Sequence, residues 1–222
     1  MPRYAISDIH GCNQTFLALL EQIRFSKEDE LFLLGDYIDR GPDSKGVIDT
    51  IWRLQAEGHT VHCLRGNHEQ MAINGMRKGE DHVGHWLRNG GGATLASFGD
   101  NLEEAYVKWM EDLPYYLESP GYILVHAGFD FFGPPLENKK AMIWERYWYD
   151  SIDYEWLGDR IILHGHTPIS WTEIEQMRDQ ISIHQVLDID AGCVFTRERY
   201  ERLCAFDMDR RELTFVLRVE EM

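Results

Sequence analysis

Short apolar runs alternate with stretches of helical periodicity through the first half of the chain. The runs at residues 4–7, 31–34 and 59–64 predict three buried strands. Between them, apolar residues recur every three or four positions over 13–25 and 44–57, which predicts helices, and another helix is expected after the third run. Strands that alternate with helices in this way are typical of a largely parallel sheet.

The second half of the chain predicts more strands and fewer helices. A helix is expected over 102–112, and the apolar runs at 115–117 and 122–125 predict a pair of strands. Four further strands are expected at 161–163, 185–189, 202–207 and 212–219, the last two as a hairpin. With sheet at both ends of the sequence and helices outside, we expect one α/β domain over residues 1–222, built as a two-sheet sandwich.

Composition and charge narrow the class of protein. The chain has 222 residues, of which 44% are hydrophobic and 27% charged, as in ordinary globular proteins. Its 22 basic and 38 acidic residues give a net charge of −16, and no Lys/Arg-rich run is present. Nucleic acids and anionic membranes bind basic patches, so we expect neither as a partner.

The cysteines and the apolar runs indicate a cytoplasmic protein. The four cysteines form no Cys-x-x-Cys pair. No run approaches the roughly 18 consecutive apolar residues of a membrane span, and the first residues show no apolar signal region. We therefore expect reduced thiols and a cytoplasmic location.

Polar residues cluster directly after the predicted strands. The run at 31–34, for example, leads straight into Asp36, Asp39 and Arg40, although burying carboxylates is costly unless they are paired. Five loops share this feature, and ligands bind beyond the carboxyl ends of strands in open α/β sheets, so we expect the five to converge. They are Asp8-Ile9-His10-Gly11, Gly35-Asp36 with Asp39-Arg40-Gly41, Arg65-Gly66-Asn67-His68-Glu69, His126-Ala127-Gly128 and His164-Gly165-His166-Thr167.

The residue types in these loops indicate a metal centre. Carboxylate oxygens, imidazole nitrogens and an amide oxygen suit divalent ions such as Mn²⁺, Fe or Zn²⁺. The loops hold more candidate ligands than one open catalytic ion needs, which favours two ions that share a bridging carboxylate. Two ions about 3.5–4 Å apart activate water and polarise phosphoryl oxygens, which serves phosphoester hydrolysis.

The ordered motifs resemble those of a known family. Asp-x-His-Gly, Gly-Asp-x-x-Asp-Arg-Gly, Gly-Asn-His-Glu, His-Ala-Gly and Gly-His-Thr, spread over residues 8–166, are similar to the metallophosphoesterases, and within them to bacterial and phage-type serine/threonine protein phosphatases. The resemblance implies an α/β/β/α sandwich of the calcineurin-like type. It also implies hydrolysis of phosphoserine and phosphothreonine in a phosphoprotein or phosphopeptide, by direct attack of a metal-bridging hydroxide and without a phosphoenzyme.

The resemblance implies a ligand set for two divalent ions, with Mn²⁺ as the first choice and Fe or Zn²⁺ as alternatives. Asp8 and His10 would bind the first ion, Asp36 would bridge both, and Asn67 would bind the second ion and contact the substrate phosphate. Pro168 stands where many metallophosphoesterases have a second His, so the first ion would keep more water ligands. The six implied ligands are Asp8, His10, Asp36, Asn67, His126 and His166.

The same resemblance implies the catalytic and phosphate-binding residues. His68 would protonate the leaving alkoxide, and Asp39 would orient His68. Arg40 would hold the phosphate. A second phosphate-binding arginine follows a Trp in this family, and the sequence IWERYW makes Arg146 the candidate, with Arg160 as the alternative.

Three alternatives stay open at this point. A dinucleoside polyphosphate hydrolase would use the same site, but such relatives typically carry Ala at the position of Asp39 and Asp at the position of Glu69. A broad small-molecule phosphoesterase is the second alternative, and phosphotyrosine activity stays undecided. A non-catalytic module on the same fold is the third, although such a module would be expected to lack a ligand or the acid, and all are present here. The sequence favours no particular oligomeric state.

Part of the chain between the third loop and the fourth shows no clear pattern of helix or strand. Residues 75–100 are rich in glycine and aromatic residues, and the hypothesis is that they form a rim that shapes substrate access. Its tryptophans are expected in the core or rim, and residues 90–92 as a turn. Residues 137–159 show no clear periodicity either.

Overall fold

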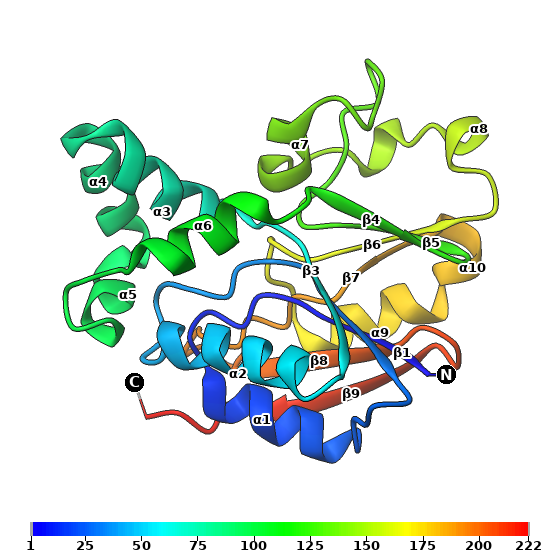
Figure 1. Cartoon of the computed structure of the whole chain (residues 1–222). Helices are drawn as coiled ribbons and strands as arrows, with labels where there is room; N and C mark the ends of the chain where they lie inside the picture. Colours follow the sequence, from blue (N-terminus) through cyan, green and yellow to red (C-terminus); the bar gives the residue numbers. More distant parts are fainter. Residues whose placement is uncertain (1, 222) are drawn as a thin grey trace.

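Two β-sheets pack face to face in the computed structural model, which describes residues 2–221 (Figure 1). The first sheet has the order β3-β2-β1-β8-β9, in which β1, β2 and β3 are parallel and β8 and β9 form an antiparallel hairpin beside β1. Its strands are β1 (Arg3–Ile6), β2 (Glu30–Leu33), β3 (Thr60–Cys63), β8 (Arg202–Asp207) and β9 (Glu212–Leu217).

The second sheet has the order β4-β5-β6-β7. Its strands β5, β6 and β7 are parallel, and β4 pairs with β5 in the antiparallel sense. Its strands are β4 (Tyr116–Ser119), β5 (Tyr122–Val125), β6 (Ile161–His164) and β7 (Val186–Asp188).

Side-chain alternation along β2 explains why its sequence is apolar throughout. Leu31 and Leu33 pack into the core under the helices, whereas Phe32 and Leu34 pack into the core between the two sheets. Successive side chains of a strand point to opposite faces, so a strand with a layer on each side needs both sets apolar.

Helices cover the outer face of each sheet. On the first sheet the helical core contains Phe16, Val47, Met71 and Val107, and on the second Met142 and Leu157 pack with the strand residues. These helices are α1 (Asn13–Gln22), α2 (Ser44–Ala56), α3 (Asn67–Lys78), α6 (Glu104–Asp112), α7 (Lys139–Trp144) and α8 (Tyr154–Leu157). The layers confirm the predicted α/β/β/α sandwich.

Several elements lie where the sequence has no clear apolar periodicity. The glycine-rich stretch is helical, as α4 (Glu80–Trp86), the π turn η1 (Leu87–Gly91) and α5 (Gly92–Ser97), and Figure 1 shows it grouped with α3 and α6 at one side. A short 3-10 turn, η2 (Tyr149–Ser151), lies within the unassigned residues 137–159. Two helices were not predicted at all, α9 (Trp171–Asp179) and α10 (Ile181–His184). α9 has a capping box of Ser170 and Glu173, which is the sequence signal that could have located its start.

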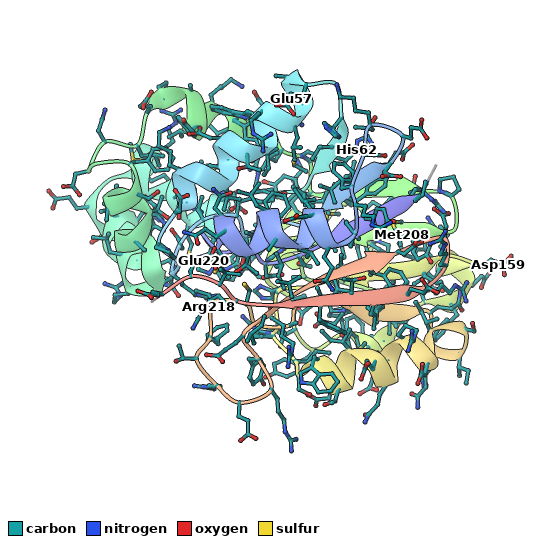
Figure 2. The ribbon with its side chains drawn as sticks, turned by 90° about the horizontal axis from the view of Figure 1, so that it is seen from below. Glu57, His62, Asp159, Met208, Arg218 and Glu220 are labelled. Atoms are coloured by element: carbon teal, nitrogen blue, oxygen red, sulfur yellow. The ribbon has the colours of Figure 1, made fainter. Side chains whose placement is uncertain are left out.

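The segment after β9 returns along α1. Figure 2, seen from below, labels Arg218 and Glu220 on this segment. The Glu220 carboxylate accepts hydrogen bonds from the Thr15 backbone N–H at 2.9 Å and from the Thr15 hydroxyl at 2.5 Å, and this fixes the segment to the start of α1. Within residues 2–221, none of the helices has the length and apolar character that a membrane crossing requires.

Candidate metal centre

The five predicted loops follow the carboxyl ends of strands from both sheets. Those after β1, β2 and β3 come from the first sheet, and those after β5 and β6 come from the second. All six predicted ligands are buried, at 5% exposure or less. The sandwich therefore brings together residues that are up to 158 positions apart, as the hydrogen bond from the His166 backbone N–H to Asp8 Oδ2 at 3.0 Å shows.

The loops hold an unusual backbone conformation. Six of the twelve non-glycine residues with positive φ in the described chain belong to the predicted site. Positive φ is uncommon for residues with a Cβ, and it persists where the surrounding structure enforces it, often at functional sites. The six are Asp8, His10, Asp36, Asp39, Arg40 and His166.

Asp36 lies at the middle of the ligand set. Its Oδ2 is 3.6 Å from Nε2 of His10, and its Oδ1 is 3.5 Å from Nε2 of His126. Two compact groups of potential ligands share it: His10, Asp36 and His68 on one side, and Asp36, His126 and His166 on the other. A carboxylate between two groups suits a bridging ligand.

Asn67 and its two histidine neighbours place acceptor atoms against one another. Nδ1 of His126 donates to the Leu34 carbonyl at 2.9 Å, so in the neutral ring Nε2 carries a lone pair. That Nε2 faces Oδ1 of Asn67 at 3.0 Å as well as the Asp36 carboxylate. Burial, the largest cause, lowers the pKa of His126, which disfavours a proton on Nε2.

His166 completes this group. Its Nδ1 is 2.9 Å from Oδ1 of Asn67, and its Nε2 is buried without a hydrogen-bond partner among residues 2–221. Lone pairs that converge in a buried space are stabilised by a cation. The chemistry of these donors therefore fits a divalent ion.

The other side of Asp36 is arranged differently. Nδ1 of His10 donates to the Ile38 carbonyl at 2.8 Å, and its Nε2 accepts from the Arg40 guanidinium at 2.7 Å. The Asp8 carboxylate accepts from the Ser7 hydroxyl and from the backbone of His166, and neither compact group includes Asp8. His10 and Asp8 are thus each oriented by hydrogen bonds, as metal ligands commonly are.

Crowded carboxylates give a second reason for a cation. Burial, then the charges of Asp8 and Glu69, raise the pKa of Asp36 well above its usual value. An ionised carboxylate in such a place is costly unless positive charge compensates it. Divalent cations would supply that charge on both sides of Asp36.

His68 and Asp39 form a buried pair beside the ligands. Nδ1 of His68 lies 2.6 Å from Oδ2 of Asp39, and Nε2 of His68 lies 3.9 Å from Asp36, so the second ring nitrogen faces the centre. Burial raises the pKa of Asp39 to about 7, against the opposing effect of its hydrogen bonds from Thr94 and Trp86. Burial, then the Arg40 charge, lowers the pKa of His68. A bound phosphate dianion would favour the protonated imidazole.

Two residues that hold Asp39 were missed by the sequence reasoning. The Trp86 indole N–H donates to both oxygens of Asp39, at 2.9 and 3.0 Å, and the Thr94 hydroxyl donates to Oδ1 at 2.6 Å. Both come from residues 75–100, and no periodic signal marked them. The same segment lets Gly90 approach Arg40: the Arg40 N–H donates to the Gly90 carbonyl at 3.2 Å, and Gly90 has φ +108°.

Glu69 also has a role that the sequence reasoning did not assign. Its carboxylate accepts the backbone N–H groups of Asp36, Tyr37 and Gly66 at 2.8–2.9 Å. It therefore ties the loop after β2 to the loop after β3. Its place in the Gly-Asn-His-Glu motif was the only available signal.

The two arginine candidates lie in different surroundings. Arg146 donates to the Thr167 hydroxyl at 2.9 Å, next to the predicted ligand His166. Arg160 instead pairs with Glu118 at 2.8 Å and donates to backbone carbonyls of its own turn. The geometry favours Arg146 for contact with a bound phosphate.

His164 points away from the ligand group. Its Nε2 lies 2.7 Å from the Tyr149 hydroxyl, and its ring packs against Trp148 at 5.1 Å between centroids. Burial lowers its pKa to about 4, so the ring is neutral near pH 7.

Comparison with known proteins agrees with this arrangement. The family model described as calcineurin-like phosphoesterase matches residues 1–206. Serine/threonine-protein phosphatase 1 of Salmonella typhimurium is 26% identical, with 86% of this chain and 87% of the relative covered. The asymmetrical bis(5'-nucleosyl)-tetraphosphatase PrpE of Anoxybacillus flavithermus is 27% identical over 86% of this chain and 85% of its own length.

Other relatives match over shorter stretches or in fold alone. The symmetrical bis(5'-nucleosyl)-tetraphosphatase of Nitrosomonas europaea is 31% identical over 58% of this chain, which spans only 45% of that relative. A crystal structure provisionally described as a diadenosine tetraphosphatase superposes with a TM-score of 0.68 at 20% identity, with 99% of this chain and 95% of that chain covered.

Proposed function

Because the chain belongs to the calcineurin-like phosphoesterase family, we propose that it hydrolyses phosphoserine and phosphothreonine monoesters in proteins. The observation that carries this proposal is the buried contact of 2.6 Å between Nδ1 of His68 and Oδ2 of Asp39. An imidazole held by a carboxylate, with its free nitrogen toward the centre, is the arrangement of a general acid.

The leaving group decides whether such an acid is needed. Serine and threonine leave as alkoxides, which are strong bases and require a proton during P–O cleavage. A nucleotide that leaves from a dinucleoside polyphosphate is a stable anion and requires much less assistance. A dedicated, buried acid therefore supports a phosphomonoester with a poor leaving group.

The proposed centre holds two divalent ions, with Mn²⁺ preferred and Fe or Zn²⁺ as alternatives. Asp8 and His10 would bind one, Asp36 would bridge, and Asn67, His126 and His166 would bind the other. Bound there, the ions would lower the pKa of water and polarise the phosphoryl oxygens.

The remaining roles belong to side chains at the rim of the centre. Arg40 and Arg146 would bind phosphoryl oxygens, for which the planar guanidinium is well suited, and Asn67 would contact the phosphate as well. His68 would give its Nε2 proton to the departing serine oxygen as the P–O bond breaks. Asp39 would keep the ring oriented and stabilise its charged form.

A dinucleoside tetraphosphate is the second candidate substrate. It is favoured by the tetraphosphatases among the relatives, at 27% and 31% identity. The two candidates use the same ligands and differ in their need for the His68 proton.

The proposal is tested by kcat/KM on a phosphoserine peptide, on p-nitrophenyl phosphate and on diadenosine tetraphosphate, for the wild type and Asp39→Asn. We expect the wild type to prefer the phosphopeptide over the tetraphosphate. Asp39→Asn should slow the phosphopeptide about 100-fold or more, and p-nitrophenyl phosphate much less because its leaving group is stable. Metal content should not change.

Asp43→Asn is the matched control. Asp43 lies in the same loop and caps α2 by accepting the Gly46 N–H at 2.9 Å, and Asn caps helices equally well. A wild type that prefers diadenosine tetraphosphate, or an Asp39→Asn enzyme slowed equally on all three substrates, would refute the proposal.

A further inference from the structure

A basic groove lies between α3 and α7, beside the metal centre. It has a volume of about 320 Å³. We call it the lysine groove, and it is lined by Gln70, Asn74 and Lys78 from α3 and by Lys139, Lys140 and Trp144 from α7.

The groove lies near two proposed metal ligands, Asn67 and His166. Gln70, Asn74 and Lys78 are spaced by four residues, so they form one stripe along α3, the helix that begins at Asn67 and His68. At the other wall, the Trp144 ring lies 6.3 Å from the ring of His166. A substrate with its phosphate at the centre could therefore extend along this stripe.

The lysines carry uncompensated charge. The groove lining includes no Asp or Glu, in a chain with 38 of them and a net charge of −16. Within residues 2–221, no carboxylate lies within ion-pair distance of Lys78, Lys139 or Lys140. Arg77, the neighbour of Lys78, contrasts with them because it pairs with both Glu104 and Glu111.

A buried guanidinium adds to the positive potential. Arg65 is 8% exposed and donates to Oε1 of Gln70 at 3.0 Å and to the Tyr115 hydroxyl at 2.8 Å. Its other partners in the described chain are the backbone carbonyls of Glu111 and Leu113, so every partner is neutral. The Tyr115 ring, itself in the groove wall, lies 4.6 Å from the Arg65 guanidinium carbon and 5.2 Å from the Lys139 amine. An unpaired cation under the wall favours an anionic occupant.

We propose that the lysine groove binds acidic side chains that flank the phosphorylated residue of a protein substrate, an inference that rests on the proposed phosphatase function. Lys78 follows His68 by ten residues, a rise of about 15 Å along the helix. An extended peptide covers about 3.3 Å per residue, so an acidic residue roughly three to five positions from the phosphoserine would reach the lysines.

The test compares two phosphoserine peptides that differ only at those positions, with Glu in one and Gln in the other. We expect the wild type to prefer the Glu peptide, mostly through KM, and the preference to weaken as salt is added. In Lys139→Glu/Lys140→Glu the ratio of kcat/KM between the two peptides should fall roughly tenfold. Glu is favourable in the first turn of α7, so this variant is expected to fold.

Two further variants make the result specific. Lys78→Glu reverses a charge on the opposite wall and should lower the same ratio. Lys27→Glu makes the same change on an exposed residue before β2, at the end of that strand far from the centre, and should leave the ratio as in the wild type.

The outcomes distinguish a failure of the groove proposal from a failure of the proposed function. If the wild type hydrolyses both peptides equally, or if the groove variants keep its preference, the groove proposal is wrong and the phosphatase function stands. If neither peptide is a substrate and diadenosine tetraphosphate is, the proposed function fails. A loss of tetraphosphate turnover in the groove variants would then assign the lysines to a polyphosphate chain and overturn the acidic-peptide proposal.

Discussion

Gly165 allows two of the proposed ligands to approach each other. A Cβ at this position would lie 2.0 Å from the Ser7 hydroxyl and 2.2 Å from Oδ2 of Asp8. The loop after β6 can therefore pass close to the loop after β1 only with glycine here. Asp8 then accepts the His166 N–H, and the two sheets share one centre.

Gly165→Ala should disturb the proposed metal centre without unfolding the protein. The added methyl group must displace Asp8 or Ser7, and a displacement of about 1 Å near the reacting groups can cost roughly 100-fold in rate. We expect phosphopeptide turnover to fall by about that factor, with metal content reduced. Turnover and bound metal are measured together.

Gly133→Ala serves as the control, since a Cβ there meets open space. Full metal content and wild-type rates in Gly165→Ala would contradict the steric account.

At the level of elements, the loops that carry the motifs could be predicted from the sequence. The residues that hold the site side chains in place, and some of the helices, could not. Asp36, Asn67 and His166 follow apolar runs, so strand position and residue type together indicated a common edge of the sheets. Trp86 contacts Asp39 across 47 positions of sequence, and no periodicity or spacing predicts such a contact. The helix α9 was missed because its apolar pattern is short: only Trp171, Ile174 and Met177 recur every three residues, and of these only Ile174 is buried.

The helical segment α4–α5 positions the proposed acid, and Trp86→Phe tests this. The change removes the indole donor to Asp39 and keeps an aromatic ring. The bond from Trp86 stabilises ionised Asp39, whose pKa burial raises to about 7, so its loss should raise this pKa further. A less ionised Asp39 would stabilise protonated His68 less. We expect kcat on the phosphoserine peptide to fall about tenfold with KM nearly unchanged, and p-nitrophenyl phosphate to be affected less.

Trp109→Phe is the matched control for loss of ring volume. Trp109 packs against Tyr37 and Trp52 in the helical core, and among residues 2–221 its indole makes no hydrogen bond to Asp39. An equal effect of both substitutions on all substrates would show that α4–α5 acts on folding alone. The hypothesis that residues 75–100 shape substrate access is separate and is tested by exchanging the segment with that of a relative.

At the scale of the whole molecule, the proposed metal centre lies where the two sheets meet. Two sheets share an apolar core, and the carboxyl ends of their parallel strands meet where buried donors surround Asp36. Although the net charge is −16, Arg40 and Arg146 stand at this end and the lysine groove lies beside it. Acidic composition therefore does not prevent binding of an anionic substrate.

The most direct measurement is anomalous diffraction from a crystal grown with Mn²⁺. The account predicts two manganese peaks about 3.5–4 Å apart, one on each side of Asp36, the first near Asp8 and His10 and the second near Asn67, His126 and His166. A single peak, or peaks away from Asp36, would contradict it.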